Sequence, residues 1–448
     1  MAIEISSNAE EYSALADKIL KLAAVEGASQ AQVSLSHSTG LSLRMRQGRV
    51  TSRMRETHSG FTLTVFNGQK KGSVNSTDLR GRTLEDSVKA ACAIARFTGE
   101  DAAAGVASPE QLCRAPKELS LFHPWDLDEA KAMRLAARME EGLASVGDDV
   151  QSEGVWINSN QLFYLLATSE GFNSSTTQSF HNLGASALGR NANFSEMDMW
   201  SEGARNFALI PQPEDIGRKA GVNARAYLNQ QPLTSRRSPV LFDARSACSL
   251  IGHLTQAISD QALYTGSSFL RNKLGQQVLA DHVSLYEDPY ALAGNSSLAF
   301  DSDGIAPLQR YVVNGGSLNG YFLSLYGARR LGLTPTGNGF GPSNLLLSSS
   351  RTQSRDDFPA MLKALGTGLL VTSLTGNGIR MITGDYSRGA RGFWVENGVI
   401  QHAVTGITIS GNLAQMFMGI VGLGSDRFTQ GSFSTGSILV DQMQISGE

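Results

Sequence analysis

The sequence has few cysteines, few charged residues and no long apolar run, and each shortage excludes a class of protein. Its three cysteines, Cys92, Cys113 and Cys248, are an odd number without CxxC spacing, so neither a disulfide framework nor a cysteine zinc site is expected. Apolar runs such as Gly368–Val371 fall far short of the roughly 20 residues that a membrane span needs. We therefore expect reduced thiols and no contact with a membrane.

The charge balance excludes a general affinity for nucleic acid. With 38 basic and 41 acidic side chains the formal charge is −3, so there is no overall basic field and direct nucleic-acid binding is not expected. The first residues, MAIEISSNAEEY, carry acidic groups and no apolar stretch flanked by lysine or arginine. We therefore expect no secretory signal and a cytoplasmic protein.

Glycine is abundant where charge is scarce. Glycine accounts for 47 of 448 residues, and charged residues make up 18% of the chain against about 25% in an average domain. It is most frequent in the carboxy-terminal half, in which no lysine follows Lys363. This composition predicts many turns and much sheet.

The spacing of apolar residues changes along the chain and predicts an α+β fold. It is helical over residues 8–26, and it has period two around Gln47-Gly48 and before Asn67-Gly68, which predicts two hairpins. Further helices are predicted near residues 83–97, after Asp126, near 215–228 and around 243–262, with later hairpins at Asn314-Gly315 and Asn397-Gly398. The elements come in blocks without regular βαβα alternation, which favours the α+β class.

Irregular, proline-containing stretches divide the chain into three regions. Pro109, Pro116 and Pro124 interrupt the pattern before residue 126, and Pro232 and Pro239 mark a linker. We expect an N-terminal helix-and-hairpin domain over residues 1–125, a middle α+β region over 126–235 and a larger, glycine-rich, β-dominated C-terminal domain over 236–448.

No compact catalytic or nucleotide-binding motif is present. Gly337-Asn338-Gly339 and Gly376-Asn377-Gly378 do not complete GxGxxG, and there is neither a GxxxxGK[ST] loop nor a GxSxG elbow. Seven histidines are scattered singly, so no HExxH helix or HxH pair can be assembled. A composite site made from distant histidines remains open, although isolated histidines are more often packing or surface residues.

The first predicted hairpin carries a one-sided basic pattern. If Gln47-Gly48 is a two-residue turn, period two places five arginines on one face with the apolar residues opposite. These are Arg44, Arg46, Arg49, Arg53 and Arg55. Such a basic ribbon can bind an acidic partner, a peptide carboxylate or a phosphate, but a charged outer face is also the ordinary solution for a half-buried hairpin.

Four segments resemble a known family. They are GDYSRGARGFWVENG at 384–398, ITISGN at 407–412, FNGQKKGSVNSTDL at 66–79 and LFHPW at 121–125, which are similar to the PmbA/TldE branch of the TldD/PmbA family. The resemblance extends over essentially the whole chain and implies an α+β fold. It also implies proteolysis, because TldD-like and TldE-like subunits form a heterodimeric zinc metalloprotease that trims unfolded peptides, including a peptide-antibiotic precursor and an antitoxin. An older description of the branch is modulator of DNA gyrase.

The resemblance also implies that the helix from Asp243 corresponds to the HExxxH helix of the catalytic subunit. In that motif two imidazoles hold Zn²⁺ and the glutamate acts as a base on the bound water. Alignment by the preceding apolar pair, Leu250-Ile251, places the motif on Gly252, His253 and Ala257, so both ligands and the base are missing.

A shift of one residue does not restore the motif. His253 then stands for the first ligand, but Leu254 replaces the base and Ile258 the second ligand. The family's further cysteine ligand near the carboxy terminus has no counterpart, because Cys248 is the last cysteine. The resemblance thus implies a chain with no cofactor of its own, with zinc on a TldD-like catalytic partner.

A non-catalytic subunit of this kind is expected to hold peptide rather than cleave it. Unfolded peptides are the implied substrates, and β-strand addition binds them independently of their side chains. A lone chain can form a homodimer through the surface that otherwise meets the partner, and the sequence leaves open whether it does. The alternatives are an independent peptidase with a composite site and a regulatory protein that acts on DNA gyrase.

The segment before the Asn397-Gly398 hairpin supplies candidate peptide-binding side chains. We predict a turn-rich stretch there whose polar groups bind peptide polar groups or termini, namely Asp385, Tyr386, Arg388 and Arg391. The alternative is that these residues order the loop or the interface between subunits.

Overall fold

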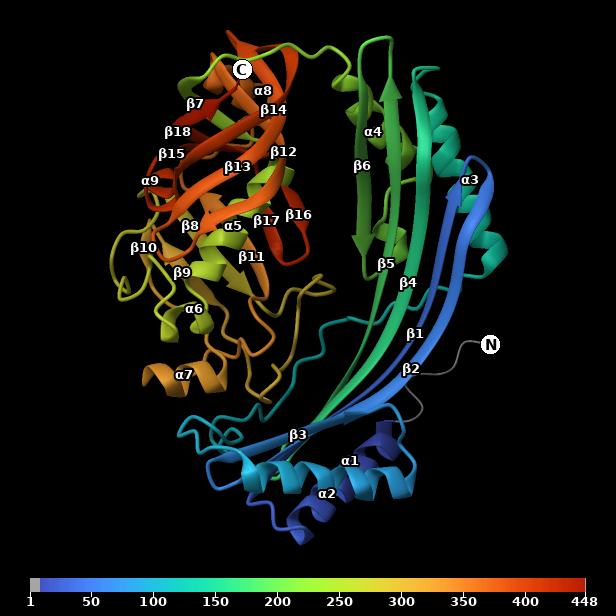
Figure 1. Ribbon diagram of the computed structural model, residues 1–448, viewed down its shortest axis with the longest axis vertical. Coiled ribbons are helices and arrows are strands. Elements are labelled where there is room, and N and C mark those ends of the chain that lie inside the picture. The colour runs from blue at the N-terminus through green and yellow to red at the C-terminus, as the bar shows by residue number, and fades with distance from the viewer. Residues whose placement is uncertain (1–8, 448) are drawn as a thin grey trace.

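The computed structural model describes residues 9–447, and these form three six-stranded sheets (Figure 1). One sheet belongs to the amino-terminal half and two belong to the carboxy-terminal half. Helices and strands occur in blocks, which confirms the predicted α+β class and the β-rich C-terminal region. Residues 1–8, on which much of the prediction about a secretory signal rests, lie outside the described part.

The first sheet is antiparallel, has the strand order β3-β2-β1-β4-β5-β6, and unites the N-terminal and middle regions. Its strands are β1 (Gln30–Arg46), β2 (Arg49–Asn67), β3 (Lys70–Ser76), β4 (Val150–Thr168), β5 (Asn173–Arg190) and β6 (Ser195–Ala204). The central pair is β1 with β4, in register from Gln32 opposite Thr168 to Met45 opposite Val155. The two regions divided near residue 125 therefore share one hydrogen-bonded sheet.

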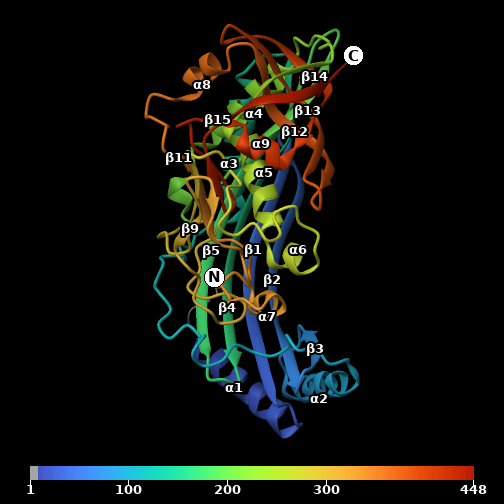
Figure 2. The same ribbon diagram turned by 90° about the vertical axis from the view of Figure 1, so that its left-hand side faces the viewer.

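Helices cover the two ends of this long sheet, with a separate core under each pair. At one end α1 (Ala9–Val25) and α2 (Gly81–Phe97) bury Ile19 and Val88 against Leu63. At the other end α3 (Glu129–Ala144) and α4 (Pro213–Ala226) bury Met139 and Ile216. Figure 2 shows α1 and α2 at one end of the molecule and the C-terminal strands at the other.

The C-terminal half has two sheets packed around one core. The first has the order β14-β13-β12-β7-β18-β15, with an additional β14–β18 pairing that closes five of its strands on themselves, and the second has the order β10-β9-β8-β11-β17-β16. Their strands are β7 (Arg236–Phe242), β8 (Val283–Asp288), β9 (Arg310–Asn314), β10 (Ser317–Leu318), β11 (Asn344–Ser349), β12 (Gly368–Arg380), β13 (Asp385–Glu396), β14 (Val399–Asn412), β15 (Ile420–Leu423), β16 (Phe428–Gln430), β17 (Phe433–Thr435) and β18 (Ile438–Ser446).

The remaining helices belong to this half or to the connection before it. They are α5 (Ala244–Ala257), α6 (Asp260–Tyr264), α7 (Leu325–Leu331), α8 (Phe358–Leu365), α9 (Leu413–Met418) and the 3-10 turn η2 (Phe207–Leu209). The helix α5 contributes Leu250 and Leu254 to the core that both sheets share. In residues 9–447 no helix is both long and apolar enough to cross a bilayer.

The predicted hairpins are present, with two turns displaced by one residue. The turn predicted at Asn314-Gly315 spans Gly315-Gly316, because Asn314 pairs with Ser317. Arg46 pairs with Arg49 across the Gln47-Gly48 turn. Asn397 and Gly398 both have positive φ, 51° and 76°, as a type I′ turn requires. The turn predicted at Asn67-Gly68 instead spans Gly68-Gln69, because Asn67 pairs with Lys70.

Candidate functional site

The helix α5 begins with an N-cap residue that forms the capping hydrogen bond, and it ends earlier than the sequence suggested. The carboxylate of Asp243 accepts a hydrogen bond from the backbone N–H of Ser246 at 2.7 Å, which satisfies one of the free donors of the first turn. The predicted helix over 243–262 is two helices, since α5 ends at Ala257 and α6 begins after the cap residue Ser259.

The three positions aligned with the zinc motif lie in different surroundings. A Cβ at Gly252 would lie 3.6 Å from the ring of Phe433, an ordinary contact, so a side chain could leave the helix there. His253 instead faces β13, with its ring centroid 5.9 Å from that of Tyr386 at an interplanar angle of 68°. Ala257 is fully buried in the core. Along residues 9–447 no group of three or more His, Cys, Asp or Glu side chains is placed to hold a metal ion.

The segment predicted to be turn-rich is a regular strand, which corrects that prediction. Residues 385–396 form β13, hydrogen-bonded to β12 on one side and β14 on the other. Because side chains alternate along a strand, Tyr386 and Arg388 lie on the face toward the core, and Asp385 lies on the opposite face. Asp385 is exposed and accepts a hydrogen bond from the Thr383 hydroxyl at 2.6 Å. Two of the four predicted residues therefore reach α5.

The cluster formed by His253, Tyr386 and Arg388 is electrostatically unusual. Burial, aided by the charge of the Arg388 guanidinium, lowers the pKa of His253 from 6.5 to about 4. Burial also raises the pKa of Tyr386 well above its ordinary value. At neutral pH the imidazole and the phenol are therefore uncharged, and Arg388 supplies the charge of the cluster.

Arg391 lies elsewhere, in an ion-pair group between the first sheet and the C-terminal half. Its guanidinium donates to the Asp198 carboxylate at 2.6 Å and to the carbonyl oxygen of Met197 at 2.7 Å. Asp198 also pairs with Arg245 at 3.5 Å, and Arg391 stacks 4.4 Å from the ring centroid of Tyr227. Arg391 is thus held by internal contacts that link β13 to β6.

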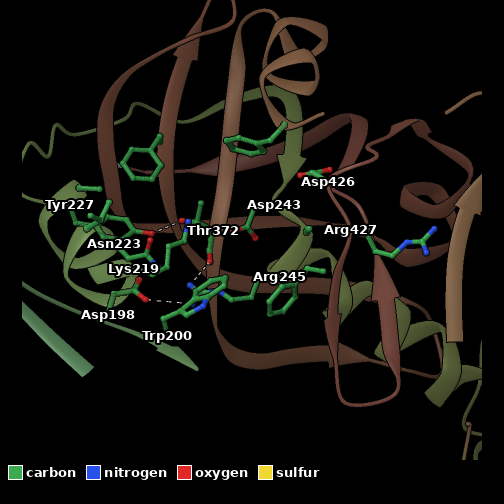
Figure 3. Close-up of a pocket in the computed structure, with 16 residues that line it drawn as sticks. Asp198, Trp200, Lys219, Asn223, Tyr227, Asp243, Arg245, Thr372, Asp426 and Arg427 are labelled. Carbon is green, nitrogen blue, oxygen red and sulfur yellow. Dashed lines mark hydrogen bonds and ion pairs between the residues drawn. The ribbon is translucent and has the colours of Figure 1, made fainter. Parts of the chain in front are cut away.

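A pocket of about 340 Å³ adjoins this ion-pair group (Figure 3). Its walls come from β6, α4, the start of α5, β12, β13 and β16, so it lies between the two halves of the chain. Trp200 forms part of the wall, with Lys219 at 5.2 Å and Arg245 at 5.5 Å from its ring centroid. Burial raises the pKa of Asp243, which also lines the pocket. With Asp198 already paired, the pocket offers aromatic and cationic contacts rather than a reactive group.

The arginines of the first hairpin do not share one face, which corrects the predicted ribbon. Arg44 lies opposite Ser52 and Met45 lies opposite Val50, so Thr51 is an extra residue in β2 and forms a β-bulge. Beyond the bulge, Arg53 lies opposite Leu43 and Arg55 opposite Leu41, on the apolar side of the hairpin.

The bulge therefore divides the five arginines into two groups. Arg44, Arg46 and Arg49 remain together on one face, and Arg46 pairs with Glu153 at 2.8 Å. Arg53 points toward α3 instead, where it pairs with Glu129 at 2.5 Å. The sequence signal for the bulge was absent, because Thr51 is an ordinary strand residue.

The side chains that build the junction pocket were also missed. Asp198 and Trp200 lie on β6, far in sequence from Arg245 on α5, and the three belong to no motif; only the packing of β6 against the C-terminal half brings them together. A tryptophan flanked by alternating acidic residues, as in Asp198-Met199-Trp200-Ser201-Glu202, was the one local sign available.

Comparison with known proteins gives consistent matches over the chain. Three family models match: PmbA/TldA metallopeptidase domain 1 over residues 31–95, the central domain over 122–228 and the C-terminal domain over 235–447. The metalloprotease PmbA of Escherichia coli O157:H7 is 36% identical over 419 residues, which cover 93% of this chain and 92% of that protein.

Two solved structures have the same fold. A Bacteroides thetaiotaomicron protein described as a proposed modulator of DNA gyrase has a TM-score of 0.92 at 24% identity, covering 98% of this chain and 99% of the other. TldE from Thermococcus kodakarensis has a TM-score of 0.83 at 14% identity, and the match covers 97% of this chain and 100% of the other.

Proposed function

This chain belongs to the PmbA/TldA metallopeptidase family, and from that premise we propose that it is a PmbA/TldE-like, non-catalytic subunit of a two-chain zinc metalloprotease. In this proposal a TldD-like partner holds the zinc and cleaves unfolded peptides in the cytoplasm. The present chain helps to enclose and hold those peptides.

The observation that carries the proposal is the composition of α5. A zinc hydrolase needs two or three protein ligands and a base near the bound water. At the aligned positions α5 has Gly252, His253 and Ala257, of which only His253 has a ligating atom. One imidazole beside an unpaired guanidinium would repel a divalent cation rather than hold it.

The outer edge of β2 supports the peptide-holding role. Within the described residues β3 pairs only with Phe61–Asn67 of β2, so Arg49–Gly60 has no strand partner on its outer side. An edge of this kind can add an extended peptide through main-chain hydrogen bonds, whatever the peptide's side chains. Arg49, Arg53 and Arg55 lie along that edge and disfavour pairing with a basic segment.

The test is to purify the chain alone and with the TldD-like subunit from the same cell. We expect no stoichiometric zinc and no peptidase activity from the isolated chain, and cleavage of an unfolded peptide when the two chains are mixed. In the mixture, His253→Gln should leave the zinc content unchanged, because His253 is not a ligand in this proposal. One tightly bound zinc per isolated chain, with peptidase activity lost on chelation, would contradict it.

The same preparation decides between the alternatives. An independent peptidase with a composite site would cleave unfolded peptides without any second chain. A regulatory protein would bind gyrase directly when the TldD-like subunit is absent. We rank the independent peptidase lower because the described residues contain no compact group of metal-ligating side chains. We rank the regulatory role lower because a net charge of −3 provides no positive field that would attract DNA.

A further inference from the structure

Three polar side chains on α5 and β13 are buried without an internal hydrogen-bond partner. Among the described residues, His253 Nε2, Tyr386 Oη and Arg388 Nε are three of only six buried side-chain atoms in this condition. The other three belong to His37, Ser343 and His402, on separate elements or loops. Leaving a buried polar group unpaired costs about 1–3 kcal/mol, so three in one place indicate a missing ligand.

The three side chains are neighbours. Tyr386 and Arg388 are two residues apart on β13 and therefore leave the same face of the strand. The His253 ring meets the edge of the Tyr386 ring from α5. The guanidinium is close enough to shift the pKa values of both neighbours.

Nothing in the surrounding structure neutralises Arg388. It forms no ion pair or hydrogen bond to any residue in 9–447. Its cross-strand neighbour on β14 is Ile409, and the neighbours of Tyr386 are Ile379 and Gly411. The buried Nε–H of this cation therefore has no acceptor within the described residues, and an anion from outside the chain would supply one.

The cluster lies close to the surface. Tyr386 is 1% exposed, whereas His253 and Arg388 each keep part of their side chains exposed, although the three unpaired donor atoms are buried. Asp385 and Arg391, the other two residues predicted for this segment, are directed elsewhere and leave the cluster to these three side chains.

We propose that His253, Tyr386 and Arg388 form a binding site for one carboxylate group of an unfolded peptide. All three donate: Arg388 through Nε–H, Tyr386 through its hydroxyl, and His253 through Nε2–H in the corresponding tautomer. A carboxylate accepts at about four lone-pair positions and can satisfy all three at once. Hydrogen bonds to a charged group are also stronger than those between neutral groups.

The identification of the carboxylate as a peptide's rests on the proposed function, but the site itself does not. Acetate carries the same head group and serves as an independent probe. We expect acetate to perturb the ring signals of His253 and Tyr386 in the NMR spectrum of the isolated chain, and not to do so in Arg388→Gln.

Peptide binding is measured with the isolated chain by fluorescence anisotropy. A labelled unfolded peptide with a free carboxy terminus is compared with its amidated form, and a glutamate-containing peptide is compared with its glutamine analogue. Preference for the free terminus identifies the α-carboxylate as the ligand, and preference for glutamate identifies a side chain. Arg388→Gln and Tyr386→Phe should each weaken binding of the preferred peptide about tenfold or more.

Tyr386→Phe is the more informative variant, because the phenol has no internal partner to lose and the ring volume is kept. If the Tyr386 hydroxyl does not bind the carboxylate, this variant should bind peptide and acetate as the wild type does. Arg355→Gln removes an exposed arginine outside the cluster and should bind as the wild type does.

The outcomes separate the two proposals. No response to acetate, or equal binding by acidic and neutralised peptides, overturns the carboxylate site and leaves the subunit role standing. A response to acetate with no binding of any peptide supports an anion site and overturns the peptide-holding role. A loss with Arg355→Gln equal to that with Arg388→Gln also overturns the site, because it assigns the effect to general charge.

Discussion

At the scale of single residues, α5 carries an imidazole that is kept neutral by its surroundings. Partial burial and a nearby guanidinium both disfavour the protonated ring of His253. A neutral imidazole can donate one hydrogen bond from Nε2 without adding a second charge beside Arg388. The residue that most resembles a zinc ligand in sequence therefore has the protonation state suited to an uncharged donor.

The depressed pKa of His253 predicts a pH dependence of stability. The folded value is about 4 and the ordinary value is 6.5, so the unfolded chain takes up the proton first as the pH falls. The contribution to stability is complete above pH 6.5 and is lost as the pH falls toward 4. Between pH 7 and pH 5 the wild type should lose about 1–2 kcal/mol more than His253→Phe.

This difference is measured by urea denaturation of both proteins at a series of pH values. Other titrating groups contribute equally to the two curves and cancel in the comparison. Parallel profiles for the wild type and His253→Phe would show that the ring is not desolvated in the fold.

Some residue-level features were accessible from the sequence and others were not. Gly252, His253 and Ala257 were found by alignment to a motif, and their place on a helix was predicted. The partners of His253 were grouped with Asp385 and Arg391, because a segment taken as turns gives no rule for the direction of side chains. Because residues 385–396 form a strand, the alternation of side chains between its two faces places Tyr386 and Arg388 on one face and Asp385 on the other.

At the scale of elements, some glycines have a second role besides the turns that their abundance predicted. Gly392 lies on β13, where a Cβ would collide with the carbonyl oxygen of Leu370, and a Cβ at Gly389 would collide with Thr375. These glycines permit β13 to approach β12 closely rather than forming turns. Composition shows that glycine is abundant. It does not show which positions require glycine, because the residues that exclude a side chain there lie on another strand, distant in sequence.

The crossing of α3 and α4 depends on glycine in the same way. A Cβ on Gly217 would overlap the carbonyl oxygen of Met139, and one on Gly142 would overlap that of Glu214. Gly217→Ala should therefore lower the free energy of unfolding by about 1–3 kcal/mol, because the two backbones must separate.

The matched control for this helix pair is Gly81→Ala on α2. A Cβ at Gly81 would meet no atom within 4 Å, and the residue is exposed at the first turn of its helix. Alanine there should be neutral or stabilising by up to about 1 kcal/mol. Equal effects of the two substitutions in thermal or chemical denaturation would contradict the close crossing.

The β-bulge at Thr51 shows why registers are the least predictable feature of an element. The turn at Gln47-Gly48, the strands and the alternation were all predicted. One unpaired residue nevertheless moved Arg53 and Arg55 to the other face, because side chains change sides with every residue of offset.

At the scale of the whole molecule, the ion-pair group around Asp198 links the first sheet to the C-terminal half. The Asp198 side chain is 2% exposed, while Arg391 and Arg245 are 21% and 23% exposed. Removing the carboxylate leaves Arg245 without its acidic partner and Arg391 with only Glu196, at 3.6 Å, in a largely enclosed space.

Asp198→Asn should therefore destabilise the protein by about 2–3 kcal/mol. This cost is below the roughly 3–5 kcal/mol that is lost when one partner of a fully buried ion pair is removed, because both arginines keep some contact with water. Asp281→Asn breaks a pair in which Arg351 and Asp281 are 63% and 72% exposed, and should cost less than about 0.5 kcal/mol. A cost for Asp198→Asn as small as that of the control would show that the junction does not depend on this group.

The pairing of β1 with β4 has a consequence for how this protein can be divided or recombined. The strand β1 comes from the first family module and β4 from the second, yet the core under α1 and α2 includes Phe163 and Leu165 of β4. A gene rearrangement that transfers residues 31–95 without 122–228 would leave this core incomplete and the edge of β1 unpaired. The two modules therefore have to be transferred together, although family models recognise them separately.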